Sequence, residues 1–324
     1  MNRICVVGTG RMGKGLALAF AYAGLPVALI DSEVRDRKAF ESLERATRDE
    51  LDSELRFLQT AEVLNARQSG AILDRIRILD WQGANADLAA ADGIFEAVVE
   101  VRDIKRRVYD WIVDYASTTA IISSTTSTLS ANDLAGLVTH PERFVNAHWL
   151  NPAHLMPLVE VSPADRTSKE NVDKLVSLLE RVGKQPVVCK ASPGFIVPRI
   201  QALAMNEAAR LVEEGIASAE DIDRAVRVGF GIRFATLGLL EFIDWGGGDI
   251  LYHATRYLGD NVDPNRFNVP DIVQDNMANE RNGLRDGEGF YDWRTREVEE
   301  YRREKLTDFV RLLQFQNLMP PPSD

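Results

Sequence analysis

A histidine and a glutamate twelve positions apart are the residues in this sequence best suited to acid-base chemistry. His148 ends an apolar run that begins at Phe144, and Glu160 is embedded in a second apolar run, Leu155 to Val161, after an Asn-Pro break. A lone charge in so apolar a strand is costly, so Glu160 needs a partner, and by topology the nearest titratable group is His148. The pattern predicts a strand, a turn and a strand, with Glu160 fixing the tautomer of His148 so that its other ring nitrogen can accept a substrate proton.

This stretch alone leaves a structural alternative open. His148 could be a core histidine bonded to the backbone, and Glu160 an edge-strand carboxylate that faces water. The start of the chain favours the functional interpretation.

The first residues of the chain carry a dinucleotide-binding fingerprint. A short buried strand, Arg3 to Val7, leads into Gly8, Gly10 and Gly13 and then into a helical pattern, Leu16 to Ala23. In such a loop the first glycine permits a tight turn, the second lets a pyrophosphate approach the helix N-terminus, and the third lets helix and strand pack closely. The residues between the glycines are expected to contact the cofactor as well: Thr9, Arg11 and Met12.

An acidic residue ends the next predicted strand. Pro26 to Ile30 reads as that strand, and Asp31 follows it directly. A carboxylate in this position accepts hydrogen bonds from the ribose hydroxyls of NAD and repels the 2′-phosphate of NADP. Strand, glycines, helix and acid agree with one another, which disfavours a glycine-rich turn without a ligand and predicts NAD as the cofactor.

Two further predicted strands end in polar residues. Gly93 to Val99 runs into Glu100, and Lys105 lies on the helix that follows; by themselves these two would most often form a surface ion pair. Ala120 to Ser124 is followed by a run of Ser and Thr that includes Ser127. Hydroxyls after a sheet strand suit contacts with cofactor or substrate, and loop formation and helix capping are the alternative.

The rest of the chain divides into an excursion and a helical second half. Residues 32 to 75 predict one or two long amphipathic helices outside the sheet. Val187 to Lys190 reads as the last strand, and after it strands disappear. We therefore expect an α/β Rossmann domain with a mostly parallel, doubly wound sheet over residues 1–192 and an all-α domain over 193–324. The helical patterns of the second half are Pro198 to Glu214, Ala219 to Val228, Gly238 to Leu258 and Arg296 to Gln316, before a frayed tail from Met319 to Pro322.

Composition narrows the classes of function. The chain has 324 residues, 45% hydrophobic and 27% charged, and no apolar run of the roughly 18 residues that a membrane span needs. A formal net charge of −11 disfavours nonspecific binding to nucleic acid or to an anionic membrane. Cys5 and Cys189 lie in apolar runs without metal-ligand spacing, which predicts two buried thiols and no metal site. Without the layout of a signal peptide at the start, the expected location is the cytoplasm.

These motifs together resemble the L-3-hydroxyacyl-CoA dehydrogenase family over nearly the whole chain. The family pattern is a GxGxxG loop, a Ser in a Ser/Thr turn, H-x-x-N-P, a Glu twelve residues after the His, a GFIVNR helix opening and a late GEGFY. The matching residues here are the three glycines of the loop, Ser127, His148 with Asn151 and Pro152, Glu160, Gly194 to Arg199, and Gly287 to Tyr291.

The resemblance implies roles for individual residues. His148 would be the general base for alcohol oxidation, and Glu160 would orient it. Ser127 and Asn151 would form hydrogen bonds with the reacting oxygen and with the nicotinamide. The remaining cofactor residues that it implies are Glu100 and Lys105.

The sequence departs from the acyl-CoA enzymes in three places. Pro198 stands where the family helix opens with Asn, so a polar substrate contact is missing, although a first-turn proline loses no helical bond. The excursion carries four carboxylates between Arg48 and Glu54, which would repel coenzyme A phosphates unless they form a solvated face elsewhere. The run Gly229 to Ala235 looks like the branch with L-gulonate dehydrogenase, lambda-crystallin and carnitine dehydrogenase, which acts on small free hydroxy acids.

Arginines are the candidates for contact with the substrate. Within that branch, Arg233 would offer a planar fork to a carboxylate, and a surface position is its alternative. Arg285, beside the GEGFY motif, is a second candidate for contact with cofactor or substrate.

The sequence therefore predicts an NAD-dependent dehydrogenase of a 3-hydroxy acid, with a small free acid favoured and (S)-3-hydroxybutyryl-CoA as the alternative substrate. The expected partner of the chain is a second copy of itself, since an apolar helical domain commonly supplies a dimer interface. A non-catalytic NAD-binding protein of the lambda-crystallin kind is the alternative of another class.

Overall fold

The computed structural model describes residues 1–319 and 322, so Pro320 and Pro321 of the predicted tail lie outside the described residues. Two compact units divide the chain, Met1–Ala204 and Met205–Asp324. The division falls inside helix α8 (Val197–Glu213), beyond the Ser192–Pro193 linker at which the sequence pattern changes.

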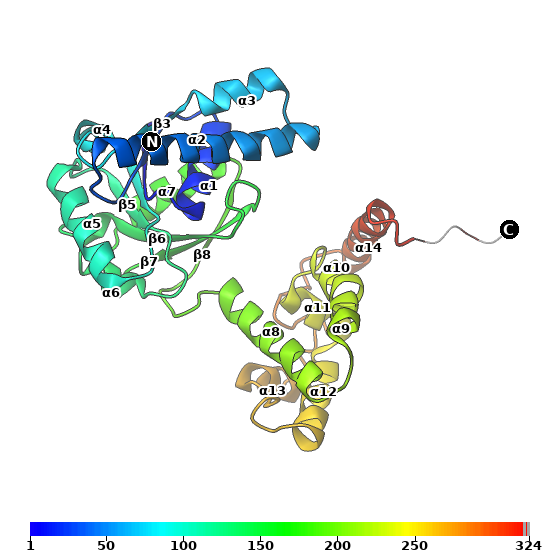
Figure 1. The fold of residues 1–324 in the computed structure, drawn as a ribbon. Coiled ribbons are helices and arrows are strands. Elements are labelled where there is room, and N and C mark those ends of the chain that lie inside the picture. Colours follow the sequence, from blue (N-terminus) through cyan, green and yellow to red (C-terminus); the bar gives the residue numbers. More distant parts are fainter. Residues whose placement is uncertain (320–321, 323–324) are drawn as a thin grey trace. The chain divides into compact units, whose positions relative to one another are not determined.

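An eight-stranded sheet forms the centre of the first unit (Figure 1). Its strand order is β3-β2-β1-β4-β5-β6-β7-β8. All neighbouring strands are parallel except β6 and β7, which are antiparallel. This confirms the predicted doubly wound, mostly parallel sheet. The strands are β1 (Ile4–Val7), β2 (Val27–Ile30), β3 (Ile76–Leu79), β4 (Gly93–Glu96), β5 (Ile121–Ser124), β6 (Phe144–Trp149), β7 (Leu158–Pro163) and β8 (Gln185–Val188).

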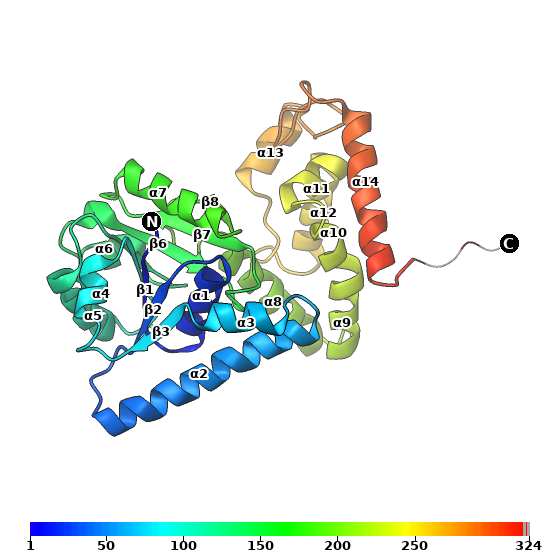
Figure 2. The same cartoon turned by 90° about the horizontal axis from the view of Figure 1, so that it is seen from above.

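Helices cover both faces of this sheet (Figure 2). One apolar cluster joins the sheet to α1 (Arg11–Tyr22), α2 (Arg37–Thr60), α3 (Ala66–Leu73) and α7 (Lys169–Arg181). A second cluster joins the other face to α4 (Asn85–Ala90), α5 (Arg102–Tyr115) and α6 (Ala131–Ala135). A short 3₁₀ turn, Pro141–Arg143, leads into β6. In the described part of the chain no helix is long and apolar enough to cross a bilayer.

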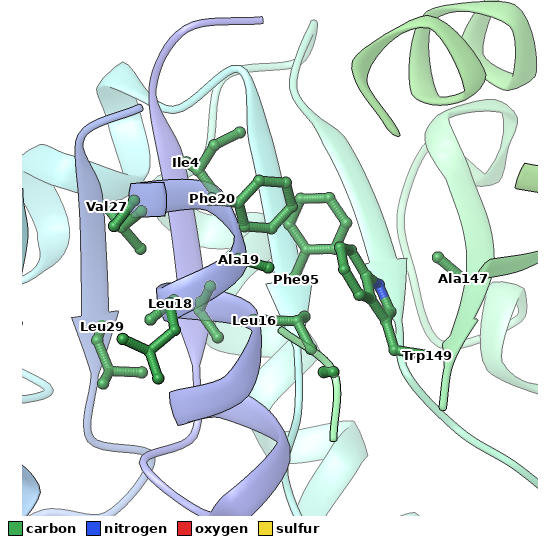
Figure 3. Close-up of a cluster of buried hydrophobic side chains, with 14 of the residues drawn as sticks. Ile4, Leu16, Leu18, Ala19, Phe20, Val27, Leu29, Phe95, Ala147 and Trp149 are labelled. Atoms are coloured by element: carbon green, nitrogen blue, oxygen red, sulfur yellow. The ribbon is translucent and has the colours of Figure 1, made fainter. Parts of the chain in front are cut away.

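Aromatic packing fixes the strand that carries His148. The ring of Trp149 meets Phe20 of α1 edge-on at 5.5 Å between centroids, and Phe20 lies 4.8 Å from Phe95 of β4 (Figure 3). Because side chains alternate along a strand, Trp149 in this core directs its neighbour His148 to the opposite face of the sheet. The core therefore determines which way the histidine points.

The structure corrects several sequence predictions in the first unit. β4 ends at Glu96, not at Val99, and β7 begins at Leu158, later than the predicted Leu155. The short strand β3 was not predicted. Cys5 is buried as expected, whereas Cys189 is only half-buried because it follows β8 at the edge of the sheet.

The second unit is helical, as predicted, and its elements differ in detail. One predicted helix over Gly238 to Leu258 is two helices, broken at Gly247, whose φ of 109° suits glycine. The segment Val226–Gly231 is a π-helical turn, and α13 was not predicted. The helices after α8 are α9 (Ala219–Ala225), α10 (Ile232–Phe234), α11 (Leu239–Gly246), α12 (Gly248–Asn261), α13 (Asp271–Ala278) and α14 (Val298–Phe315).

A buried carboxylate explains the GEGFY motif in structural terms. Asp244 of α11 is 2% exposed and accepts hydrogen bonds from the backbone N–H groups of Phe290 and Tyr291, both at 2.9 Å. The indole N–H of Trp293 donates to the same carboxylate at 2.8 Å. A side chain at Gly289 would place its Cβ 2.3 Å from Asp244 Oδ1, so only glycine fits there. The motif thus fastens the loop before α14 to α11.

Replacing Asp244 should destabilise the second unit. In Asp244→Asn the amide NH₂ would face N–H donors, so at least one buried donor loses its acceptor, at a cost of about 2–3 kcal/mol. Chemical denaturation measures the loss, with the exposed Asp260 as the matched control in Asp260→Asn. Equal stability of the two variants would contradict this role of Asp244.

Candidate functional site

The structure brings His148 and Glu160 into direct contact. The antiparallel register pairs the two residues across β6 and β7, and Nδ1 of His148 lies 2.7 Å from Oε2 of Glu160. His148 is 6% exposed and Glu160 is fully buried. Because a carboxylate only accepts, this bond places the ring proton on Nδ1 and leaves Nε2 as the free acceptor.

The second oxygen of Glu160 holds the start of helix α8. Oε1 accepts hydrogen bonds from the backbone N–H groups of Ile196, at 2.9 Å, and Val197, at 2.8 Å. The first N–H groups of a helix lack intrahelical partners, so a buried carboxylate is well suited to this place. Pro198 follows these two donors, and its missing N–H removes none of these bonds.

Phe195 connects the same helix start to the histidine. Its ring stacks on the imidazole of His148, with centroids 5.5 Å apart and an interplanar angle of 26°. Phe195 has a φ of +42°, in the left-handed region, directly after Gly194 with a φ of +74°. The Gly-Phe pair of the GFIV motif therefore forms the turn that places an aromatic ring against His148 and two N–H groups against Glu160.

The glycine loop after β1 adopts the geometry that the sequence predicts. Gly8 has a φ of +116°, and a Cβ on Gly13 would lie 1.7 Å from the carbonyl oxygen of Gly8. Gly10 precedes α1 with nothing within 4 Å of its Cβ position, and no side chain caps the helix. The first N–H groups of α1 are thus open to a phosphate, with Thr9 and Met12 half-buried and Arg11 exposed beside them.

Asp31 is buried at the end of β2 and already has a cationic neighbour. It is 2% exposed, and Arg35 donates Nε–H to Oδ2 at 2.7 Å. The backbone N–H of Glu33 donates to Oδ1 at 3.2 Å. The sequence analysis missed Arg35, although an arginine four residues after a buried acid is a signal for an ion pair.

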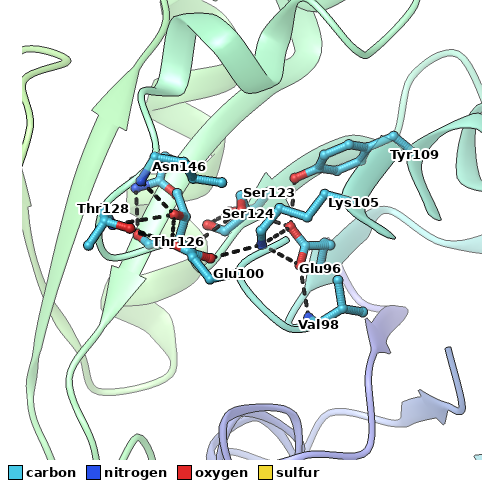
Figure 4. A network of polar contacts seen from close by, with 11 residues as sticks. Glu96, Val98, Glu100, Lys105, Tyr109, Ser123, Ser124, Thr126, Thr128 and Asn146 are labelled. Carbon is cyan, nitrogen blue, oxygen red and sulfur yellow. Dashed lines mark hydrogen bonds and ion pairs between the residues drawn. The ribbon is translucent and has the colours of Figure 1, made fainter. Parts of the chain in front are cut away.

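A buried network at the ends of β4 and β5 is the main feature that the sequence analysis missed (Figure 4). The fully buried Glu96 binds Nζ of Lys105 through both carboxylate oxygens, at 2.8 and 2.9 Å. Tyr109 and Ser124 donate hydroxyl hydrogen bonds to Oε2 of Glu96, at 2.7 and 2.8 Å. The burial of Tyr109 and the nearby negative charge of Glu96 raise the pKa of the phenol well above its usual value. Lys105 is therefore a core cation and not part of a surface ion pair.

Glu100 links this network to the turn that carries Ser127. Its Oε2 lies 3.3 Å from Nζ of Lys105, and its Oε1 accepts hydrogen bonds from the hydroxyls of Thr126 and Thr128, the latter at 3.1 Å. Despite desolvation, which opposes the shift, the hydrogen bond from Thr126 and the charge of Lys105 lower the pKa of Glu100. Ser127 lies between the two threonines and is exposed.

The candidate residues of the first unit gather at one edge of the sheet. Four of them lie at the carboxyl ends of parallel strands: the glycine loop at β1, Asp31 at β2, Glu96 at β4 and the Ser127 turn at β5. His148 lies near the carboxyl end of β6, which is parallel to β5. Ligands of doubly wound sheets bind outside this edge. Asn151 follows β6, and its exposed side chain makes no hydrogen bond within the described part of the chain.

The two candidate arginines belong to the second unit. Arg233 is exposed, its guanidinium lies 5.7 Å from the ring centroid of Phe242, and no carboxylate of residues 1–319 or 322 forms an ion pair with it. It lines a cavity of about 170 Å³ together with Lys305 and Trp245. Arg285, by contrast, is held by Asp249 and Asp286, both at 3.2 Å.

The acidic part of α2 is partly neutralised. Glu50 forms an ion pair with Lys14 of α1, and Asp52 pairs with Arg56 at 3.0 Å. Glu54 lies 3.7 Å from Nε2 of His154. The predicted repulsion of coenzyme A phosphates is therefore weaker than four free carboxylates would give.

Comparison with known proteins assigns the family. The NAD-binding domain of 3-hydroxyacyl-CoA dehydrogenase matches residues 3–192, and the C-terminal domain of the same enzyme matches residues 194–293. A 5-formyl-3-hydroxy-2-methylpyridine 4-carboxylate 5-dehydrogenase from Mesorhizobium japonicum is 30% identical over 97% of this chain and 99% of its own length. The Escherichia coli 3-hydroxyadipyl-CoA dehydrogenase is 33% identical over 91% of this chain, which spans 59% of that longer protein.

A solved structure agrees with these relatives. The 3-hydroxyacyl-CoA dehydrogenase of Archaeoglobus fulgidus superposes with a TM-score of 0.76 at 29% identity, covering 98% of this chain and all of the other. NAD is the cofactor of this Rossmann domain, and the enzymes of the family are oxidoreductases. The chain belongs to the NAD-dependent 3-hydroxyacyl-CoA dehydrogenase family.

Proposed function

We propose that the protein oxidises the 3-hydroxyl group of a small free hydroxy acid to a 3-oxo group, with His148 as the general base. The observation that carries this proposal is the buried hydrogen bond of 2.7 Å between His148 and Glu160 at the cofactor edge of the sheet. A histidine whose tautomer is fixed by a carboxylate presents one nitrogen that can only accept a proton.

In the proposed reaction His148 acts through Nε2. Nε2 takes the hydroxyl proton of the substrate, and Glu160 stabilises the imidazolium that forms. NAD, when bound, accepts the hydride from the carbon atom that carries the hydroxyl group. Ser127 and Asn151, exposed at the same edge, are proposed to donate hydrogen bonds to the reacting oxygen and to the nicotinamide amide.

The cofactor residues form a second part of the proposal. The open N-terminus of α1 would receive the pyrophosphate, and Asp31 would accept the ribose hydroxyls with Arg35 holding its carboxylate in place. Glu100 is proposed to line the nicotinamide side and to hold the Ser127 turn through the two threonine hydroxyls. Lys105 is fully buried, so its proposed part is indirect: it holds the carboxylate of Glu100 in place and does not contact the cofactor itself.

The free acid is proposed as the substrate on two observations. Arg233 has no acidic partner in the described residues and lines a cavity beside Lys305 and aromatic rings, which suits a carboxylate with a small carbon skeleton. The relative from Mesorhizobium japonicum is named for a small carboxylate. An acyl-CoA substrate such as (S)-3-hydroxybutyryl-CoA is the second candidate, favoured by the family description and by the ion pairs that neutralise part of α2. Arg285 is the weaker candidate for substrate contact because two aspartates hold it.

A homodimer is part of the same proposal. None of the residues of α8 is buried, although the helix is rich in apolar side chains. Leu203 and Met205 are each 69% exposed, and Ile216 after the helix is 66% exposed. The second unit also has a small core of its own, centred on Trp293 and Tyr301. A second copy of the chain is the proposed cover of this apolar surface.

Removing the base should abolish most of the turnover. His148→Ala is expected to lower kcat for NADH formation by about 10³-fold, the usual contribution of a positioned general base. Binding of NADH, followed by fluorescence, should change little, and sedimentation should give the mass of two chains for variant and wild type. Full turnover in the variant would refute the proposed function.

A substitution of Arg233 separates the two substrate candidates. If Arg233 binds the carboxylate, Arg233→Ala should lower kcat/KM for free 3-hydroxy acids by about 10- to 100-fold, which corresponds to the loss of a charged hydrogen bond. Turnover of 3-hydroxybutyryl-CoA should be unaffected. Arg224→Ala, which removes an exposed arginine on α9, is the matched control. Efficient thioester turnover with no measurable activity on free acids would favour the acyl-CoA alternative.

A further inference from the structure

The backbone of the loop between β6 and β7 binds the ammonium group of one lysine, Lys184. Lys184, which precedes β8, directs its Nζ at three backbone carbonyls of this loop, those of Ala153 at 2.9 Å, His154 at 3.3 Å and Met156 at 2.8 Å. The loop is the segment that joins His148 to Glu160 and carries Asn151.

The three contacts match the three hydrogens of an ammonium group. Lys184 is 8% exposed, and in the part of the chain that the structure describes no carboxylate forms an ion pair with it. Burial lowers its pKa from the usual lysine value. The hydrogen bonds to the three carbonyl oxygens therefore replace most of the hydrogen bonds to water that the ammonium group loses on burial. Lys184 in turn provides a donor to carbonyls that have no backbone partner in the turn.

The loop also packs against the helices: Ala153 is buried against α1, where a Cβ on Gly15 would lie 3.1 Å from its own, and Glu54 of α2 lies 3.7 Å from His154. Its own hydrogen bonds, however, do not attach its middle to the sheet. The N–H groups of Leu155 and Met156 both donate to the carbonyl of Pro152, which closes a local turn but does not fix it to the sheet. On the sheet side, Gln185 donates its N–H to the carbonyl of Pro157 at 2.8 Å, next to Lys184 in sequence. The ammonium group thus fastens the middle of the loop to the strand that borders β7.

The same ammonium group lies against the strand of the proposed base. Nζ of Lys184 is 5.5 Å from the ring centroid of Trp149, the neighbour of His148 in β6. That distance and geometry give a cation–π attraction. The residue therefore contacts both the end of β6 and the loop that returns to Glu160.

We infer that Lys184 is a positioning residue for the dehydrogenase reaction: it holds the β6–β7 loop so that Asn151 and the His148–Glu160 pair keep their reactive arrangement. This inference rests on the proposed function for its effect on turnover. Its effect on the loop stands independently of which reaction the protein performs.

Two measurements on Lys184→Ala separate the inference from the proposed function. The substitution orphans three carbonyl acceptors, so the amides of Leu155 and Met156 should exchange with solvent about 10- to 100-fold faster than in the wild type. kcat for the preferred hydroxy acid should fall by about 10- to 100-fold, since small displacements of reacting groups are that costly, while KM for NAD stays close to its wild-type value. Lys174→Ala, an exposed lysine on α7, is the matched control.

Chemical rescue distinguishes positioning from general stability. Propylammonium replaces the atoms deleted in Lys184→Ala, so adding it should raise the kcat of the variant several-fold and slow the exchange of the loop amides. Tetramethylammonium has no N–H donor and should do neither. If Lys184→Ala does not fold, Lys184→Arg keeps a cation with several donors and is expected to keep the wild-type exchange of the loop.

The outcomes are distinct. The inference is overturned if Lys184→Ala keeps wild-type amide exchange and wild-type kcat, or if propylammonium does not restore a lost kcat. If Lys184→Ala does not fold, fast exchange of the loop amides in a folded Lys184→Arg overturns it as well. Fast exchange and amine-dependent slowing in a protein without any hydroxy acid turnover would retain the loop contact and refute the proposed function instead.

Discussion

The organisation of the candidate site depends on one buried carboxylate with both oxygens occupied. Glu160 binds His148 through one oxygen and the first N–H groups of α8 through the other. Burying an isolated carboxylate is expensive, so the strand pair β6–β7 and the start of α8 must be in place together. The cost of burying the charge is offset only in the arrangement that also fixes the tautomer of the histidine, which ties the fold of this region to its proposed chemistry.

A second buried carboxylate organises the cofactor side in a similar way. Glu96 is surrounded by Lys105, Tyr109 and Ser124, and Lys105 extends the network to Glu100 and the Ser127 turn. Both centres lie at the carboxyl edge of the parallel strands, where backbone N–H groups and loop side chains are open to a ligand. The core beneath them, with Trp149 and Phe20 in edge-on contact, keeps the strands in register.

The sequence was sufficient to predict those features for which a pattern of neighbouring residues has only one common structural explanation. The glycine loop, the doubly wound sheet, the helical second half and the contact between His148 and Glu160 could be predicted, because glycine spacing and an acid in an apolar strand have few structural explanations. Glu96 could have been found by the rule applied to Glu160, since it too lies within an apolar run. Lys184 and Asp244 could not be found in this way, because most of their partners are backbone groups of segments distant in sequence, and a backbone group can belong to any residue type.

The most direct test of this account is the kcat of Glu160→Gln. The glutamine oxygen can still accept the N–H groups of Ile196 and Val197, so the start of α8 should persist and the variant should fold. Its amide NH₂ then faces Nδ1 of His148, which shifts the ring proton to Nε2 and removes the proposed base. We predict a decrease in kcat of about 10²- to 10⁴-fold with NAD binding retained. A folded Glu160→Gln protein with wild-type kcat would contradict the central role of this carboxylate.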